Sequence, residues 1–365
     1  MIPIFEPEFA GNERKYLLDC IDTGWVSSQG KYITRFEQAF AEWHGMPHAV
    51  ASSNCTTALH LSLLAAGIGA GDEVLVPDLT FIAPANMARL TGATAVLVDI
   101  EPETWAIDPV RAREAITPHT RAIIVVHPFG HAADMDPIMA LAREHGLAVI
   151  EDTAEAPGAR YKGRLLGTIG DFGCFSFFGN KIMTSGEGGM VLTADAAHDK
   201  ELRVLRDHGM SREEKYLHVA VGFNYRMTNM QAAIGLAQLE RLDRILEFRT
   251  AQARRYEARL AESPRVKWRP RTNWCEPVHW LATITVDSRA ARESLMRSLA
   301  ADGIETRIMI PTIHSAPPYR NGAGDDAFPV ASRIAATGVH LPSGATLRED
   351  DVDRICDRVI AWAKT

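Results

Sequence analysis

The sequence lacks the features typical of membrane, disulfide-rich and nucleic-acid-binding proteins. Its 365 residues include five scattered cysteines without a C-x-x-C pair, which argues against disulfides or zinc and favours reduced thiols in the cytoplasm. No run approaches about 18 uninterrupted apolar residues, and the first residues form no apolar targeting segment, so we expect neither a membrane span nor a signal peptide. A net charge of −7 and a pI near 6.0 argue against a nucleic-acid partner.

A dinucleotide-binding fingerprint and metal-ligand spacings are also missing. No G-x-G-x-x-G follows a strand-like run, and the glycines at 186–189 have the wrong spacing, which disfavours a nicotinamide-dependent enzyme. His127, His131 and His340 are not spaced as metal ligands, so we predict no metal site and interpret them as structural. With 46% hydrophobic residues, the chain can bury two domains, which we place at residues 1–246 and 247–365.

What is present is an alternation of strand-like and helix-like segments, which predicts an α/β fold with a mostly parallel sheet. The expected strands are residues 73–76, 94–98, 121–126, 147–150, 173–178 and 189–193. Helical patterns at 84–89 and 137–144 connect some of them. A long helix beginning near Thr228 should lead to a smaller domain around the apolar run 280–286, with a terminal helix at 349–363.

Lys181 is the first candidate catalytic residue. It is one of only eight lysines, and it lies between the apolar run Phe175–Phe178 and the glycine cluster at 186–189. An amine beside apolar walls loses hydration, which favours the neutral, nucleophilic form that a Schiff-base lysine requires. A surface lysine on a glycine loop is the alternative interpretation.

Asp152 is the second candidate, because the buried strand expected at 147–150 runs directly into Glu151 and Asp152. A carboxylate at the end of a core strand is costly to desolvate unless a cation or several donors meet it. It is either the cap of a following helix or the partner of the protonated ring nitrogen of pyridoxal 5'-phosphate (PLP).

A candidate phosphate site follows the short apolar strand that begins at Ala49. A polar turn leads into a helix that opens near Thr56, and backbone N–H groups at a helix start bind anions together with hydroxyls such as those of Thr56 and Thr57. Such turns also serve simply as helix caps. Ser176 should point away from Phe175 and Phe177 on the alternating strand, as a further phosphate donor or as a small core residue.

Together these segments resemble the DegT/DnrJ/EryC1/StrS family of PLP-dependent sugar aminotransferases, which have fold type I. The resemblance runs in order from about Trp25 to His314 and is carried by residues 53–61, 71–81, 151–156, the Lys181 segment and 222–241. It implies a large domain with a mostly parallel, mixed sheet and a smaller α+β C-terminal domain. The Phe-Phe-Gly-Asn before Lys181, Glu155 and the pieces at 305–307, 311–314 and 318–319 resemble a branch that acts on GDP-linked sugars.

The resemblance also implies roles for individual residues. Lys181 would form the Schiff base with PLP and later move a proton, and Asp152 would pair with the ring nitrogen. Phe81 would stack on the ring, although a core phenylalanine is the alternative. Asn224 matches an asparagine that reaches the phosphate from the neighbouring subunit, which implies a homodimer with a shared active site. The phosphate would be held by Thr56, Thr57 and Ser176.

Two positions depart from the common family pattern. Cys55 replaces a glycine, and it would strain the turn if that glycine had a positive φ angle. Glu155 stands where many relatives have a glutamine that touches the phenolic oxygen of the ring, and the GDP-sugar branch shares this glutamate. Substrate contacts are expected from Trp25, Ser27, Arg226, Arg307 and His314, since arginine pairs well with planar oxyanions, although surface arginine is common.

The reaction implied by the resemblance is a transamination in two halves. L-glutamate would donate its amine and leave pyridoxamine 5'-phosphate as the intermediate form, which would then aminate a nucleotide-linked 4-keto-6-deoxy sugar, foremost GDP-4-keto-6-deoxymannose. The alternatives are dTDP-, UDP- or 3-keto sugars, a sugar dehydratase of the same fold, and a PLP-binding regulator without turnover. GDP-sugar dehydratases of this family carry histidine at the lysine position, so Lys181 favours transamination.

Overall fold

A seven-stranded sheet forms the centre of the computed structural model, which describes residues 1–320 and 322–365. Its strand order is β1-β9-β8-β5-β4-β2-β3, with parallel pairing from β8 through β5, β4 and β2 to β3 and antiparallel pairing of β9 with β1 and β8. The predicted α/β fold with a mostly parallel, mixed sheet is confirmed. The strands are β1 (His48–Ser52), β2 (Glu73–Pro77), β3 (Thr94–Val98), β4 (Thr120–Val126), β5 (Ala148–Asp152), β8 (Phe172–Ser176) and β9 (Gly189–Thr193).

Helices cover both faces of this sheet because its strands are apolar on both sides. On β4, Ile123 and Val125 belong to one core, whereas Ile124 and Val126 belong to the other, as the two-residue period of a strand requires. The first core also contains side chains of α2 (Lys31–His44), α5 (Pro109–Ala115), α6 (Met135–His145) and α8 (Asn229–Leu239). The second contains side chains of α3 (Cys55–Ala65), α4 (Ala83–Leu90) and α7 (Ala196–Arg206).

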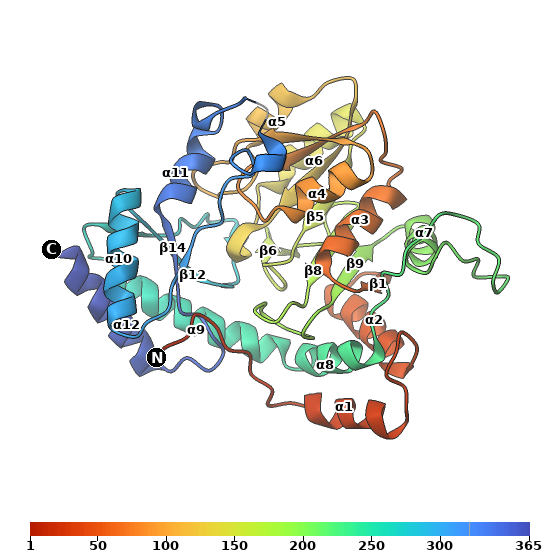
Figure 1. The fold of residues 1–365 in the computed structure, drawn as a ribbon, viewed down its shortest axis with the longest axis horizontal. Helices are drawn as coiled ribbons and strands as arrows, with labels where there is room; N and C mark the ends of the chain where they lie inside the picture. Colours follow the sequence, from red (N-terminus) through yellow and green to blue (C-terminus); the bar gives the residue numbers. More distant parts are fainter. Residues whose placement is uncertain (321) are drawn as a thin grey trace.

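A second sheet lies at the opposite end of the molecule from α7 (Figure 1). It is antiparallel, with the order β10-β12-β14-β13, and it packs with α9, α10 and α12 around a third core. Ile2 belongs to this core and pairs with Ile304, so the first residues of the chain contact the C-terminal part. The elements are β10 (Val266–Trp268), β12 (Ala282–Val286), β13 (Arg307–Ile308), β14 (Gly338–Leu341), α9 (Leu242–Leu260), α10 (Arg289–Ala301), α11 (Pro329–Thr337) and α12 (Glu349–Ala363).

The long helix expected near Thr228 is wrong as a single element, because the chain forms two helices, α8 and α9. Thr228 caps α8, and Arg241 leaves helical geometry with φ −117° and ψ 5°. At this break Glu240 accepts hydrogen bonds from Asn12, the N-cap of α1 (Glu13–Asp22), and from Tyr16 within α1, and Arg241 pairs with Glu8. The two helices therefore separate where their connecting residues hold the N-terminal segment.

The predicted division into domains at residues 246 and 247 falls inside α9 and stays a prediction.

A further small sheet is formed by β11 (Cys275–Glu276), β6 (Arg160–Tyr161) and β7 (Arg164–Leu165). None of the helices in the described part of the chain is both long and apolar enough to cross a bilayer. The fold thus places the carboxyl ends of β2, β4, β5 and β8 at one edge of the central sheet.

Candidate active site

A cavity of about 500 Å³ opens at this edge of the central sheet. A volume of this size is typical of small-molecule sites. The ends of β4, β5 and β8 contribute Val126, Asp152 and Ser176, and the second sheet contributes Arg307 and Ile308. The remaining lining residues are Asn54, Cys55, Thr56, Leu59, Thr80, Phe81, Ala83, Ala154, Glu155, Phe178, Asn180, Lys181, Glu187, Trp280, Leu281, Ile310 and His340.

The last two residues of β5 are the carboxylates Glu151 and Asp152, and they differ in their hydrogen-bond partners. Glu151 is fully buried and accepts hydrogen bonds from the backbone N–H groups of Gly167, Ile169 and Gly170, with His127 Nε2 3.0 Å away. Burial would raise the pKa of Glu151, but His127 and the backbone donors hold it below its usual value. Glu151 is therefore a satisfied structural carboxylate, and His127 is structural as expected.

Asp152 is buried with far fewer partners. The hydrogen bonds that the described residues give it, from Ala154 N at 3.1 Å and from Cys55 Sγ at 3.8 Å, both end on Oδ1. Burial raises the pKa of Asp152 to about 6, because these contacts do not offset the desolvation. No helix follows Asp152, so it is not the helix cap of the alternative interpretation. It is a buried acid that needs a positively charged or N–H partner from the cavity side.

Lys181 lies on the loop after β8, and its side chain is 12% exposed. Its Nζ is 3.3 Å from Glu155 Oε1 and 3.8 Å from the centroid of the Trp280 ring. The expected apolar walls are therefore only part of its surroundings, since a carboxylate also touches the amine. Both contacts are typical of an ammonium group. Glu155 is fixed in turn, because its Oε2 accepts a 2.8 Å hydrogen bond from Phe129 N.

The N-terminus of α3 forms the third part of the cavity. Asn54 is its N-cap, with Oδ1 accepting from Thr57 N at 2.9 Å, while the Thr57 hydroxyl bonds back to the Asn54 backbone. The hydroxyl of Thr57 thus serves the capping box, and only Thr56 of the two threonines lines the cavity. Cys55 is the first residue of α3 and is not among the residues with positive φ, so the strain considered for this position is absent.

The other residues expected at the cofactor also face the cavity. Ser176 lines it, whereas Phe175 and Phe177 are fully buried in the first core, as the predicted alternation requires. Phe81 lines the cavity with 62% of its surface exposed, so it is not the core phenylalanine of the alternative interpretation. Its ring is free to cover a bound group.

The expected substrate contacts divide into one inside and four outside this cavity. Arg307 lines it from β13. His314 is elsewhere: its Nδ1 is 2.7 Å from the buried Asp78 and its Nε2 is 3.0 Å from Asp325. The backbone oxygens of Trp25 and Ser27 accept hydrogen bonds from Asn229, and neither residue is among those that line the cavity.

Asn224 and Arg226 also lie outside the cavity of their own chain. Arg226 pairs with Asp207 at 3.0 Å and donates from Nε to Asn224 Oδ1 at 3.0 Å. Both residues belong to the segment 207–228, which we call the arm, and Figure 1 shows this segment between α7 and α8 reaching away from the body of the molecule.

Sequence reasoning missed several residues of the cavity, among them Asn54, Trp280 and His340. The Asn-x-x-Thr spacing of a capping box could have indicated Asn54. His340 was interpreted as structural, but it lines the cavity, and burial together with Arg307 and Arg269 lowers its pKa to about 3, so it is neutral. No signal in the sequence places Trp280 beside Lys181, since 98 residues separate them.

The residues present fit PLP. Lys181 supplies an amine, Asp152 supplies a buried acid without a cation, and the first turn of α3 offers backbone N–H groups without an acidic side chain. Lys181 would bind the aldehyde and Asp152 the ring nitrogen, while Thr56 and Ser176 would hold the phosphate. In the described part of the chain, no three His, Cys, Asp or Glu side chains are grouped as a metal site.

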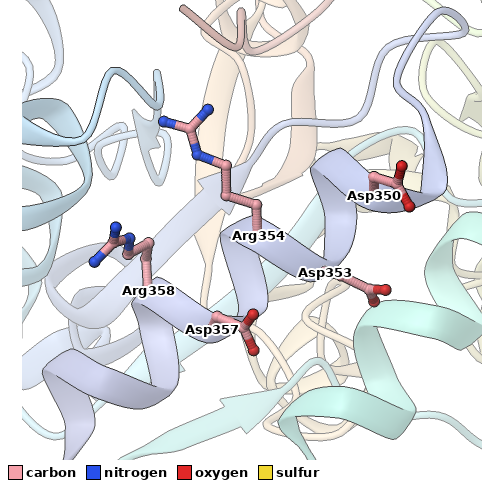
Figure 2. A pocket seen from close by; sticks show the side chains of 5 residues that line it. All are labelled: Asp350, Asp353, Arg354, Asp357 and Arg358. Atoms are coloured by element: carbon pink, nitrogen blue, oxygen red, sulfur yellow. The ribbon is translucent and has the colours of Figure 1, made fainter.

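A second hollow, of about 380 Å³, lies on α12, but its chemistry is that of a solvated surface (Figure 2). It is lined by Asp350, Asp353, Arg354, Asp357 and Arg358. Figure 2 shows the two arginines on one side of the helix and Asp353 and Asp357 on another. Arg358 pairs with Asp302, whereas Asp353 and Asp357 pair with arginines of α9. Most of the charges in this hollow are thus paired with neighbouring groups of the chain.

Comparison with known proteins agrees with the geometry of the first cavity. The model of the DegT/DnrJ/EryC1/StrS aminotransferase family matches residues 7–360. Proteins called GDP-perosamine synthase from Caulobacter vibrioides and Vibrio cholerae are 47% and 44% identical, covering 97% and 98% of this chain and 96% and 98% of their own. The PLP form of the sugar aminotransferase Spr1654 from Streptococcus pneumoniae is 28% identical, with a TM-score of 0.95 over 100% of this chain and 98% of that one.

Proposed function

The chain belongs to the DegT/DnrJ/EryC1/StrS aminotransferase family, and we propose that it moves the amino group of L-glutamate onto a nucleotide-linked 4-keto-6-deoxy sugar. Membership makes it a PLP-dependent aminotransferase. The proposed substrate is GDP-4-keto-6-deoxy-D-mannose and the product GDP-perosamine, which relatives with 40–47% identity over nearly their full length support by name. The observation that carries the proposal is that an amine and an under-satisfied buried acid, Lys181 and Asp152, line one cavity.

The residues of the cavity have separate tasks in this reaction. Bound PLP supplies an electron sink for the carbon that loses or gains a proton. The Asp152 carboxylate would stabilise a proton on the ring nitrogen, and its burial would strengthen this electrostatic effect. The Nζ of Lys181 would act first as a base, taking the proton from the amine-bearing carbon of the donor, and then as an acid, passing that proton to the cofactor. Glu155, 3.3 Å from Nζ, orients the amine.

The substrate assignment is tested with purified enzyme, L-glutamate labelled with ¹⁵N, and a panel of GDP-, dTDP- and UDP-linked keto sugars. We expect ¹⁵N in the sugar of GDP-4-keto-6-deoxymannose, read by mass spectrometry, and a much lower rate with the other nucleotides. Transfer to a dTDP or UDP sugar instead would overturn the GDP assignment. Loss of a hydroxyl without gain of nitrogen would make the protein a dehydratase.

A homodimer is the proposed working unit. Asn224 is exposed at the base of the arm, where it bridges to Asp207. The arm also exposes the apolar side chains of Tyr216, Leu217, Val219 and Val221, the last of these 89% exposed. Apolar side chains clustered on a projecting segment are typical of a surface that another chain covers. These observations support the proposal that Asn224 reaches the phosphate group in the cavity of a second copy.

Mixed dimers test this shared site. Lys181→Ala and Asn224→Ala chains are each inactive or weak alone, the second because a hydrogen bond to a charged group is lost. When the two are unfolded, mixed in equal amounts and refolded together, we expect about a quarter of the wild-type activity, since half of the dimers are hybrids with one intact site. Refolded single variants are the control. No recovery in confirmed hybrids would mean that Asn224 acts within its own chain.

The proposed compartment is the cytoplasm. All five cysteines are free and buried, as expected for a chain without disulfides. Burial raises the pKa values of the Cys55 and Cys174 thiols, so both stay neutral and unreactive. Such thiols suit a reducing environment.

A further inference from the structure

The amine of Lys181 rests on the face of an indole ring that comes from a distant part of the chain. Its Nζ lies 3.8 Å from the centroid of the Trp280 ring, which is within the range of a cation–π contact. Glu155 Oε1 touches the same Nζ at 3.3 Å, which is longer than an ideal charged hydrogen bond. The ammonium is therefore shared between a carboxylate and an aromatic face.

Trp280 is itself held in place from three directions. Its Nε1 donates a 2.6 Å hydrogen bond to the backbone oxygen of Asn180, the residue before Lys181. The Phe129 ring lies parallel to the indole, at an angle of 1° and a centroid distance of 6.3 Å. The backbone oxygen of Trp280 accepts a 3.4 Å hydrogen bond from Nη1 of the buried Arg249. An indole fixed in this way can hold an amine at one position.

The contact also joins the two sheets. Trp280 lies two residues before β12 of the second sheet, whereas Lys181 follows β8 of the central sheet. Because the indole N–H is bonded to Asn180, the ring and the backbone of the lysine loop keep their mutual position. Core packing alone does not require this bond, since an apolar side chain would fill the same space without a donor.

We propose that Trp280 is a positioning residue for Lys181. Its ring face holds the protonated Nζ whenever the amine is not bonded to the cofactor, so that the proton stays at a fixed place in the cavity. The role in turnover rests on the proposed function, but the resting position is a property of the cofactor-free chain. The indole N–H anchors the ring, and the ring face binds the charge.

The reactivity of Lys181 in the cofactor-free protein tests this proposal directly. Acetic anhydride acylates neutral amines, and mass spectrometry of the Lys181 peptide gives the rate at that one residue. At pH 8 we expect Trp280→Leu to speed acylation of Lys181 about 3- to 10-fold, because the cation–π contact that favours the ammonium is gone. Trp280→Phe keeps an aromatic face and should lie much closer to the wild type than Trp280→Leu.

Internal and matched controls separate this effect from a general loosening of the fold. Acylation of the exposed Lys162 and Lys200 should not change in any variant. Trp43→Leu removes a partly buried tryptophan whose Nε1 bonds to Asp243, away from the cavity, and should leave the Lys181 rate unaltered. A wild-type rate at Lys181 in folded Trp280→Leu would overturn the proposal.

Turnover gives the second measurement. With PLP and glutamate, we expect Trp280→Leu to lower kcat while KM for glutamate stays within about twofold, because the ring positions a proton donor and does not bind the substrate. A higher KM at unchanged kcat would make Trp280 a substrate-binding residue and contradict the proposal. Failure to aminate any GDP sugar, with the acylation difference intact, would count against the proposed substrate alone.

Discussion

Lys181→Ala is expected to abolish amino transfer. The loss of its proton transfer alone should lower kcat by about 10²- to 10⁴-fold, and the loss of the nucleophile adds to this. The same variant should bind PLP without the visible absorbance band that a lysine-bound cofactor gives. The measurement is a pair of spectra with added PLP, together with the rate of 2-oxoglutarate release from glutamate.

Lys162→Ala is the matched control for this prediction. Lys162 is exposed and paired with Asp136 on the surface, so its removal should leave both the band and the rate intact. A normal band in Lys181→Ala would show that another amine holds the cofactor. A normal band with no turnover in the wild type would favour the PLP-binding regulator over the enzyme.

Asp152→Asn is expected to reduce kcat by roughly 10²- to 10³-fold, because a neutral amide cannot stabilise the proton on the ring nitrogen. The same change should stabilise the cofactor-free chain, since it removes a buried charge that lacks a cation. A gain in stability together with a loss of activity is the behaviour of a carboxylate kept for function. Glu151→Gln is the contrasting variant, and it should destabilise the fold because Glu151 has several donors.

The pH dependence of this stabilisation follows from the pKa of Asp152. That pKa is raised to about 6 in the folded cofactor-free chain, from an ordinary value of 3.8. Below the ordinary value the acid is protonated in both states and does not affect stability. As the pH rises from 3.8 to about 6, only the unfolded chain releases the proton readily, so the folded state is progressively destabilised, and above about 6 this penalty is complete. The gain from Asp152→Asn should therefore be about 3 kcal/mol at pH 8 and about half of that at pH 5.

Urea unfolding of the two cofactor-free proteins at both pH values measures this difference. An equal gain at pH 5 and pH 8 would mean that the carboxylate is not the cause. With PLP bound, the wild type should be more stable than Asp152→Asn, because only the wild type offers the ring nitrogen a charged partner. Urea unfolding of both proteins in saturating PLP tests this reversal.

The secondary structure near the site was largely predictable because its signals are local. The apolar runs gave β2, β3, β4 and β9 within one or two residues, and the terminal helix at 349–363 matches α12. Asp152 could be identified because a carboxylate directly after a core strand is rare for energetic reasons. The residue order alone left open whether Asp152 caps a helix or faces a cofactor, and its role at the ring nitrogen stays a prediction.

What the sequence did not reveal depends on contacts between distant segments. The break between α8 and α9 is made by bonds from Glu240 and Arg241 to the first residues of the chain. The hydroxyl of Thr57 donates to the backbone oxygen of Asn54 in the helix cap and not toward the cavity. This direction depends on the side-chain conformation, which the sequence does not give. Trp280 contacts Lys181 only because the second sheet packs against the loop after β8, and no hydrophobic periodicity in the sequence predicts this packing.

The most direct test of the account is to trap the bond between the protein and its cofactor. Borohydride reduces a C=N bond between a lysine Nζ and PLP to a stable amine, and peptide mass spectrometry then locates it. We expect the added mass on the peptide that contains Lys181, with loss of the trapped product on prior treatment with glutamate. Label on any of the other seven lysines, or none at all with saturating PLP, would contradict the assignment of the active site.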